Sequence, residues 1–261
     1  MSCGAPASQA EVRVRALPHI PEVQPGHDLA ALILNALAES ESTLEDGDVL
    51  VVTQKIVSKA EGCVVDLEAV QPSPQAEKVA ANTGKDPRLV EVILSESRGI
   101  VRWRKGVLIV ETHHGWICAN AGVDRSNVAE PGRDIVLTLP ADPDRSAREI
   151  RRALMGATGS DIAVIISDTH GRAWRMGTVN LAIGVAGMEP IADVRGQKDR
   201  FGYTMRVTQV ARADELAATA GLLSGQAGEG LPVVHIRGAD YSRGEGYAES
   251  MQRPIEKDLF R

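Results

Sequence analysis

The chain has 261 residues, of which 43% are hydrophobic and 25% are charged, and its formal net charge is −6. This length and composition suit one large domain or two small ones with a buried core, and they exclude a largely disordered chain. The net negative charge argues against general nucleic-acid binding, which requires a basic surface that displaces counterions from phosphates.

Cysteines and apolar segments bear on the cellular compartment. The three cysteines, Cys3, Cys63 and Cys118, include no CxxC pair, so neither a disulfide framework nor a zinc knuckle is expected. Cys118 has apolar neighbours, which favours a small buried side chain over a nucleophile. The N-terminus lacks a basic segment followed by a long apolar one, and no run approaches about 18 apolar residues. We therefore expect a cytoplasmic protein without a membrane partner.

Caps and hydrophobic spacing predict the elements of the first half. Residues 1–10 are small and polar and are expected to be disordered. Residues 12–16 alternate as a strand does, and residues 28–38 have helical spacing with Asp28 as the cap. A turn then leads into a buried strand over residues 49–53. Asp86 and Pro87 open the clearest helix, which Gly99 is expected to end.

The second half carries two further helices and several strands. Residues 144–154 form one helix, with Gly156 after it, and residues 216–223 form another, capped by Asp214 and ended by Gly225. Strands are expected at residues 108–111, 135–139, 162–167, 181–185, 205–210 and 233–237. Because helices and strands do not alternate strictly, we expect an α+β fold with mixed or antiparallel sheets packed against helices.

Asp168 is the first candidate site residue. It follows the predicted strand 162–167, so its carboxylate is expected at the C-terminal end of that strand. Thr169 adds a hydroxyl, and an Asp-Thr pair offers the oxygen ligands that magnesium and manganese prefer. The alternative is a capped turn. Arg172 and Arg175 follow closely and favour a phosphate site, because guanidinium groups bind phosphate oxygens in a bidentate way.

Asp124 is the second candidate, in a turn rich in short polar side chains. Such a segment can be a turn and nothing more. Beside Asn120 and Asn127, however, it resembles an assembled ligand surface, and Asn127 suits a hydrogen bond to a nucleotide. Two carboxylates at strand ends can hold a divalent cation, so Asp124 and Asp168 together predict a metal and phosphate site.

Other segments offer weaker signals. Lys55 and Lys59 follow a predicted strand and are expected to be solvated, although Gln54 and Lys55, at the end of that strand, can also reach a phosphate. The glycines of residues 221–231 either form a flexible connection or let backbone N–H groups approach an anion. No segment matches GxxxxGK[ST], so any nucleotide is not held by a P-loop. Among the histidines, His170 is a better candidate for a site role than the adjacent pair at residues 113–114, of which at most one would contribute.

Several ordered segments resemble one known family. They are residues 47–62, 120–127, 167–175 and 182–187, together with the group Asp193, Arg195 and Gly196. These segments closely resemble the coenzyme F420-0:γ-glutamyl ligase family. The resemblance extends over about residues 12–238, so it does not depend on a single motif.

The resemblance implies a GTP-dependent amide ligase. GTP phosphorylates the terminal carboxylate of a deazaflavin coenzyme F420 precursor, and the amino group of L-glutamate then attacks the acyl phosphate, after which further glutamates are added through γ-linkages. The cofactors implied are two divalent ions, Mn²⁺ or Mg²⁺, with K⁺ as an activator, and GTP is the co-substrate. The resemblance also implies an unusual α+β fold that forms an intertwined homodimer.

Site residues follow from the resemblance by position. Asp124 and Asp168, the expected catalytic residues, would bind one metal ion, and Thr169 and Gln226 would bind the second. The residues expected to contact GTP are Leu17, Pro18, His19, Ile20, Gln54, Lys55, Lys59, Asn127, Ser224, Gly225, Gln226, Ala227, Gly228, Glu229, Gly230 and Leu231. Residues 17–20 and Gln226 rest on the resemblance alone.

The chain departs from the family pattern at two positions. His170 stands where an aromatic residue such as phenylalanine is usual, and Asn180 stands where an aspartate is common. Neither is an expected ligand. The expected domain organisation is a disordered segment over residues 1–10, a ligase domain or two interlocked subdomains over 11–239, and a tail or arm over 240–261.

Two other functions compete with the ligase. A dimetal phosphohydrolase would use the same aspartates on phosphate esters. A non-catalytic protein would bind a nucleotide or a deazaflavin without turnover. Glutamate-dependent release of GDP separates the ligase from both.

Overall fold

The structure is a computed structural model that describes residues 11–128 and 132–259. It confirms the predicted α+β class, with one mixed sheet of five strands and three smaller antiparallel sheets. The disorder expected for residues 1–10 lies outside the described residues. Within the described ranges, no helix has the length and apolar character needed to cross a membrane.

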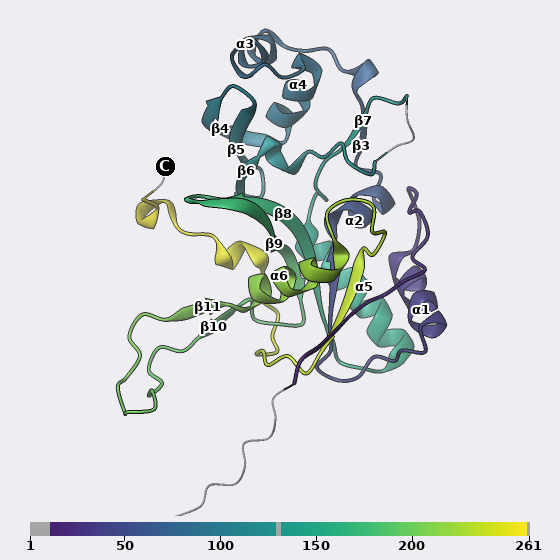
Figure 1. Ribbon diagram of the computed structural model, residues 1–261, viewed down its shortest axis with the longest axis vertical. Helices are drawn as coiled ribbons and strands as arrows, with labels where there is room; N and C mark the ends of the chain where they lie inside the picture. The colour runs from purple at the N-terminus through teal and green to yellow at the C-terminus, as the bar shows by residue number, and fades with distance from the viewer. Residues whose placement is uncertain (1–10, 129–131, 260–261) are drawn as a thin grey trace, which may run out of the picture.

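The five-stranded sheet forms the centre of the molecule (Figure 1). Its order is β1-β12-β2-β8-β9. β2 and β8 run parallel, whereas the other neighbouring pairs are antiparallel. The strands are β1 (Arg13–Ala16), β12 (Val233–Arg237), β2 (Val49–Thr53), β8 (Ala163–Arg172) and β9 (Arg175–Ala186).

Helices cover both faces of this sheet. Successive side chains on a strand point to opposite faces, and here both sets are apolar, so each face packs against its own core. On β2, Leu50 and Val52 pack with α1 (Leu29–Glu39) and α5 (Pro143–Thr158). Val49 and Val51 pack on the other side with α6 (Arg212–Ser224). A strand buried on both faces reads as a continuous apolar run, which is why residues 49–53 were recognisable in the sequence.

A second group of elements lies beyond one end of the sheet (Figure 1). Its core joins two helices to the central strand of a three-stranded sheet, through residues such as Val90, Ile93 and Leu108. The helices are α3 (Pro74–Thr83) and α4 (Pro87–Ser95). The strands are β4 (Ser97–Arg104), β5 (Val107–Thr112) and β6 (Ile117–Ala119), with a separate pair β3 (Val64–Asp66) and β7 (Ile135–Leu137).

Short elements complete the fold. α2 (Gln54–Ala60) follows β2 directly, and β10 (Ile191–Asp193) pairs with β11 (Gln209–Ala211) at the base of a segment that projects from the body (Figure 1). One-turn 3₁₀ helices occur at η1 (Leu67–Ala69), η2 (Asn120–Gly122), η3 (Ala248–Met251) and η4 (Ile255–Lys257).

Several predicted helix boundaries are confirmed by their local chemistry. The carboxylate of Asp28 accepts the N–H of Ala31 at the start of α1, and that of Asp86 accepts the N–H of Arg88 at the start of α4. Gly225 follows α6 with a positive φ of 67°, a conformation that glycine adopts without strain.

Other predicted boundaries were wrong. α4 ends at Ser95 instead of Gly99, because Gly99 belongs to β4 and lies at a shift in its pairing with β5. α5 continues past Gly156 until Gly159, whose φ of 77° closes the helix. The strand expected over residues 205–210 is reduced to β11, since only three residues pair with β10.

Asp214 does not cap α6, which was also expected. The helix begins two residues earlier at Arg212, and Asp214 lies within its first turn. Its carboxylate instead accepts the backbone N–H of Ala182 in β9 at 2.9 Å. This contact ties α6 to the central sheet.

Candidate functional site

A pocket of about 540 Å³ lies between the central sheet and the second group of elements. Its walls come from residues 20–23, the start of α2, the segment that follows β6, the middle of β8, and the loop after α6. These segments are far apart in the sequence. A pocket of this size accommodates a ligand as large as a nucleotide or part of a coenzyme.

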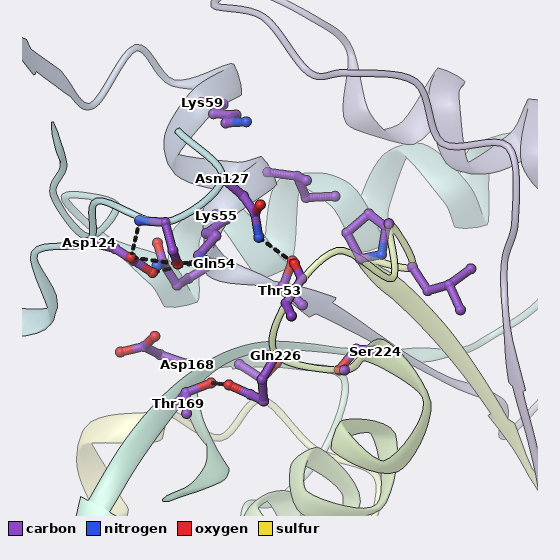
Figure 2. A pocket seen from close by; sticks show the side chains of 18 of the residues that line it. Thr53, Gln54, Lys55, Lys59, Asp124, Asn127, Asp168, Thr169, Ser224 and Gln226 are labelled. Atoms are coloured by element: carbon purple, nitrogen blue, oxygen red, sulfur yellow. Dashed lines mark hydrogen bonds and ion pairs between the residues drawn. The ribbon is translucent and has the colours of Figure 1, made fainter. Parts of the chain in front are cut away.

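Asp124 and Asp168 both line this pocket. Figure 2 shows them on the same side of it, with Lys55 beside Asp124, and with Thr169 and Gln226 near Asp168. The structure therefore brings together the two carboxylates that the sequence singled out. Their metal binding stays a prediction.

The backbone around Asp124 is fixed by pairing with β7. Its N–H and C=O exchange hydrogen bonds with Leu137 at 3.0 and 2.9 Å. The carboxylate Oδ1 accepts the N–H and the hydroxyl of Ser126, and Oδ2 lies 3.0 Å from Nζ of Lys55. One carboxylate thus has a cation and two neutral donors around it.

Asp168 lies within β8 and not at its end, which corrects the sequence prediction. The strand continues to Arg172, because it turns back at its tip into a hairpin with β9. The parallel pairing of β8 with β2 does stop at Ser167, opposite Thr53. Asp168 is therefore the first residue of β8 past the end of its pairing with β2.

Three side-chain oxygens meet beside Asp168. The hydroxyl oxygen of Thr169 lies 3.0 Å from Oδ1 of Asn180 and 3.0 Å from Oε1 of Gln226, and Nε2 of Gln226 donates to Asn180. The threonine hydroxyl has a single proton and can donate to only one of these two oxygens, so the other oxygen–oxygen contact has no hydrogen bond. A cation bound between those two oxygens would replace the missing proton.

Unpaired polar atoms give a second indication of a ligand. The side-chain oxygens of Asn120, Ser167 and Ser224 are buried, have no hydrogen-bond partner, and belong to residues that line the pocket. Buried polar groups are nearly always paired in folded proteins, so such a concentration at one place needs an explanation. A bound polar ligand or ion would provide the missing partners.

The described part of the chain contains no group of three or more His, Cys, Asp or Glu side chains that is arranged to hold a metal. Asp124 and Asp168 therefore do not form a complete protein cage. Magnesium is commonly held by one or two carboxylates, with phosphate oxygens and water as the other ligands. Two carboxylates with neighbouring hydroxyl and amide oxygens fit that mode of binding.

Two lysines of α2 supply positive charge. Besides its ion pair with Asp124, Lys55 donates to the hydroxyl of Ser126 at 2.6 Å. Lys59 is 8% exposed and pairs with the carboxylate of Glu22. Since both lysines line the pocket, each can exchange its present partner for a phosphate oxygen.

The end of α6 and the loop after it line the pocket with Ser224, Gln226 and several glycines. Asn127 connects to it by donating its side-chain N–H to the carbonyl of Ala227 at 2.6 Å. Glu229, expected to contact GTP, does not line the pocket but accepts the backbone N–H of Ala227 at 2.8 Å. That hydrogen bond lowers the pKa of Glu229, so the loop already holds an anion of its own.

The structure divides the segment Leu17, Pro18, His19 and Ile20, which the resemblance assigned to GTP. Ile20 lines the pocket, whereas the other three do not. Leu17 is fully buried in the apolar core, so its side chain is not available to a ligand. His19 has a positive φ of 66°, which places a bend in the chain just before the pocket wall.

The sequence predicted no contact for two of the pocket residues, Asn180 and Glu22. Asn180 contacts Thr169 only because β8 and β9 pair in a register that places the two residues opposite each other. Glu22 lies in the irregular segment between β1 and α1 and forms an ion pair with Lys59 of α2. A partner defined by strand pairing or by loop packing cannot be read from sequence spacing.

None of the remaining candidate residues lines the pocket, and Arg172 and Arg175, expected at a phosphate site, lie at the tip of the β8–β9 hairpin instead. His113 and His114 bond to the carbonyls of Ser95 and of Pro140, and neither lines the pocket. Cys118 is buried, as expected, and this burial raises the pKa of its thiol to about 12. His170 lies 3.1 Å from the carboxylate of Asp168.

Comparison with known proteins gives one consistent result. The model of the family described as F420-0:Gamma-glutamyl ligase matches residues 18–238. The chain is 50% identical over 244 residues to the coenzyme F420:L-glutamate ligase of Methanothermobacter thermautotrophicus, an alignment that covers 93% of this chain and 96% of the relative. It is 48% identical over 254 residues to the protein of that name from Methanopyrus kandleri, covering 96% and 98% of the two chains. A third protein of that name, from Methanocaldococcus jannaschii, is 46% identical over 218 residues and is aligned over 84% of this chain and 86% of its own.

Proposed function

Because the chain belongs to the F420-0:gamma-glutamyl ligase family, we propose that it joins L-glutamate to the terminal carboxylate of a deazaflavin coenzyme F420 precursor, with GTP as the phosphoryl donor. The observation that carries this proposal is the pocket itself. It combines two carboxylates, two lysines, and the three neighbouring side-chain oxygens of Thr169, Asn180 and Gln226. Together these groups suit a triphosphate with a bound cation.

The residues present fit the expected metal ions. Asp124 and Asp168 would hold one divalent cation, and Thr169 and Gln226 would hold a second. Mn²⁺ and Mg²⁺ are the expected ions because they prefer oxygen ligands, and K⁺ is proposed as an activator on family grounds alone. When bound, divalent cations neutralise the negative charge that gathers on a phosphoryl group during transfer.

The chain's own groups would bind and orient the triphosphate. Lys55 and Lys59 would donate to phosphate oxygens once they release Asp124 and Glu22. The loop of residues 224–231 would offer backbone N–H groups, which requires the Glu229 carboxylate to leave the N–H of Ala227. Asn127 holds that loop against the segment that carries Asp124.

The proposed reaction has two steps. A carboxylate oxygen of the precursor bonds to the γ-phosphorus of GTP, and the bond to the leaving GDP oxygen breaks. The nitrogen of L-glutamate then bonds to the acyl carbon and loses its proton, while inorganic phosphate leaves with its oxygen. Repetition on the γ-carboxylate of the added glutamate would give a γ-linked chain.

We also propose that the protein works as an intertwined homodimer. Large apolar side chains are exposed on two projections, the tip of the β8–β9 hairpin and the segment between β10 and β11. Exposed apolar groups of this kind commonly mark a protein–protein interface. A second copy is the partner that the family relationship favours.

Mass spectrometry of the deazaflavin product tests the proposed reaction. The protein is incubated with the precursor, GTP, Mn²⁺ and L-glutamate, and products separated by one glutamyl unit are expected. Release of phosphate from GTP without precursor or glutamate would instead support a phosphohydrolase. Tight binding of GTP or deazaflavin without turnover at any metal concentration would support a non-catalytic binding protein.

A further inference from the structure

A second, smaller cavity lies beside the candidate site, with a volume of about 290 Å³. It is bounded by residues 115–117 at the start of β6, by β8 and β9, by α6, and by the C-terminal segment around residues 251–258. Its wall includes His170 and Asp214, neither of which contributes to the wall of the main pocket. His170 is therefore placed between this cavity and Asp168.

The contact between His170 and Asp168 is short and sheltered. Nε2 of His170 lies 3.1 Å from Oδ2 of Asp168, and the two side chains are 9% and 11% exposed. Both residues belong to β8 and are two positions apart, so their side chains project to the same face of the strand. Because a carboxylate oxygen accepts, Nε2–H of the imidazole donates.

The two oxygens of Asp168 consequently differ. Oδ2 accepts the hydrogen bond from His170, whereas Oδ1 has no hydrogen-bond partner within residues 11–128 and 132–259. A carboxylate fixed through one oxygen cannot rotate freely about its terminal bond. Its other oxygen is then held ready for a ligand, as outer hydrogen-bond partners hold the ligands of many metal sites.

A second carboxylate, on α6, lies near the imidazole. Asp214 lies in the same cavity, close enough to interact electrostatically with His170, and is held by the N–H of Ala182. Burial raises the pKa of Asp214, and this hydrogen bond and the imidazole act in the opposite direction. His170 is thus placed between a carboxylate of the main pocket and a carboxylate of the adjacent helix.

We propose that His170 is a positioning residue for Asp168: its Nε2–H fixes Oδ2 so that Oδ1 is oriented to bind a divalent cation. The inference rests on the proposed function in one respect, that Asp168 is a cation ligand. It assigns to His170 a role that acts through Asp168 and does not touch substrate.

Direct titration with Mn²⁺ tests this role. Binding to the full-length protein is followed by electron paramagnetic resonance of the free ion, with Mn²⁺ alone and again with GDP. His170→Leu removes the donor and retains the bulk, and we expect Mn²⁺ affinity to fall roughly 10- to 100-fold, the usual effect of losing such a partner. His170→Gln retains an N–H at a similar distance from the backbone, so its Mn²⁺ affinity should stay close to that of the original protein and well above that of His170→Leu.

Kinetics and a matched control separate positioning from folding. With His170→Leu, the apparent KM for Mn²⁺ should rise while kcat at saturating Mn²⁺ largely recovers. His113→Leu removes an imidazole that bonds to the carbonyl of Ser95 and does not line the main pocket, so it should leave Mn²⁺ affinity unchanged. Thermal melting without metal verifies that each variant folds.

Two results would overturn the inference alone. Both apply where the unaltered protein binds Mn²⁺. The first is an unchanged Mn²⁺ affinity in His170→Leu, and the second is an equal loss of Mn²⁺ affinity in His170→Leu and His170→Gln. If the unaltered protein binds no Mn²⁺, the proposed metal site fails and the positioning role falls with it. Product formation measured in parallel shows whether the ligase assignment fails as well.

Discussion

At the scale of single residues, one ion pair balances the charge of a carboxylate that is expected to bind a metal ion. Lys55 neutralises Asp124, and the two side chains are 25% and 29% exposed. A divalent cation at Asp124 would displace the lysine toward the phosphates that arrive with it. The ion pair that balances the charge of Asp124 therefore also holds a lysine in reach of an incoming phosphate.

Asp168→Asn is the most direct test at this scale. The amide retains the shape but loses the charge that would attract a cation, so turnover should fall by at least roughly 100-fold, since loss of an outer partner alone costs about 10- to 100-fold. The fold should remain, as judged by circular dichroism and thermal melting. Glutamate addition at the original rate would contradict the assignment.

Asp28→Asn is the matched control for that substitution. Asp28 caps α1 away from the pocket, and asparagine caps a helix about as well as aspartate does. Turnover and melting temperature should both stay close to those of the unaltered chain.

Asn180 joins two expected ligands through one oxygen, Oδ1, which lies 3.0 Å from the Thr169 hydroxyl and 3.0 Å from Nε2 of Gln226. Asn180→Leu removes this shared acceptor, so the apparent KM for Mn²⁺ should rise about tenfold. Asn180→Asp retains the acceptor oxygen and should stay near the original value. Steady-state assays over a range of Mn²⁺ concentrations measure both, and equal behaviour of the two variants would contradict the role of Oδ1.

At the scale of elements, one buried ion network fastens the entry of β2 to β12. Asp48, with a side chain 2% exposed, accepts from Nε2 of His235 at 2.8 Å and from two nitrogens of Arg237 at 2.7 and 2.9 Å. The backbone N–H of Glu45 donates to the same carboxylate. These contacts join segments almost 190 residues apart along the chain.

The network gives a pH-dependent stability. Burial acts to raise the pKa of Asp48, but the hydrogen bonds from Arg237, Glu45 and His235 outweigh it, so the pKa lies below its ordinary value. A carboxyl whose pKa is lowered on folding stabilises the fold above its unfolded pKa of about 3.9 and loses that contribution as the pH falls through the folded pKa.

Asp48→Asn should therefore lower the free energy of unfolding by about 3 kcal/mol at neutral pH, because it leaves the half-buried guanidinium of Arg237 without its counter-charge. The difference from the unaltered protein should persist down to about pH 4 and shrink below it. Urea unfolding at a series of pH values measures this. A difference that stays constant through the acid range would show that the lowered pKa of Asp48 does not contribute.

At the scale of the whole molecule, two projections expose apolar side chains that a single chain leaves uncovered. Trp174 and Met176, at the β8–β9 tip, are 86% and 98% exposed. Phe201 and Val207, between β10 and β11, are 94% and 85% exposed. Monomeric proteins seldom concentrate such residues on projecting segments.

If these projections form the proposed dimer interface, Phe201→Glu combined with Val207→Glu should convert the protein from dimer to monomer. Charges buried in an apolar interface lose their hydration without gaining a partner. Light scattering coupled to gel filtration measures the mass. Val12→Glu, at a half-exposed position beside β1, is the matched control, and an unaltered chain of monomer mass would contradict the proposal.

The sequence by itself determined those features whose causes lie within a few neighbouring residues. The caps at Asp28 and Asp86, the glycine after α6, and the apolar run of β2 are such features, because each depends on local hydrogen bonds or on side-chain periodicity. The two aspartates stood out for the same reason, as carboxylates placed next to apolar runs. The resemblance then supplied the family, which the comparisons confirmed.

The tertiary structure alone decided how distant segments meet. It extended β8 past Asp168 into a hairpin, turned Asp214 from a cap into a partner of β9, and kept Leu17 out of the pocket. It also placed Asn180 against Thr169 and His170 against Asp168. Strand register and the packing of loops depend on contacts between residues far apart in the chain, and spacing along the sequence does not encode those contacts locally.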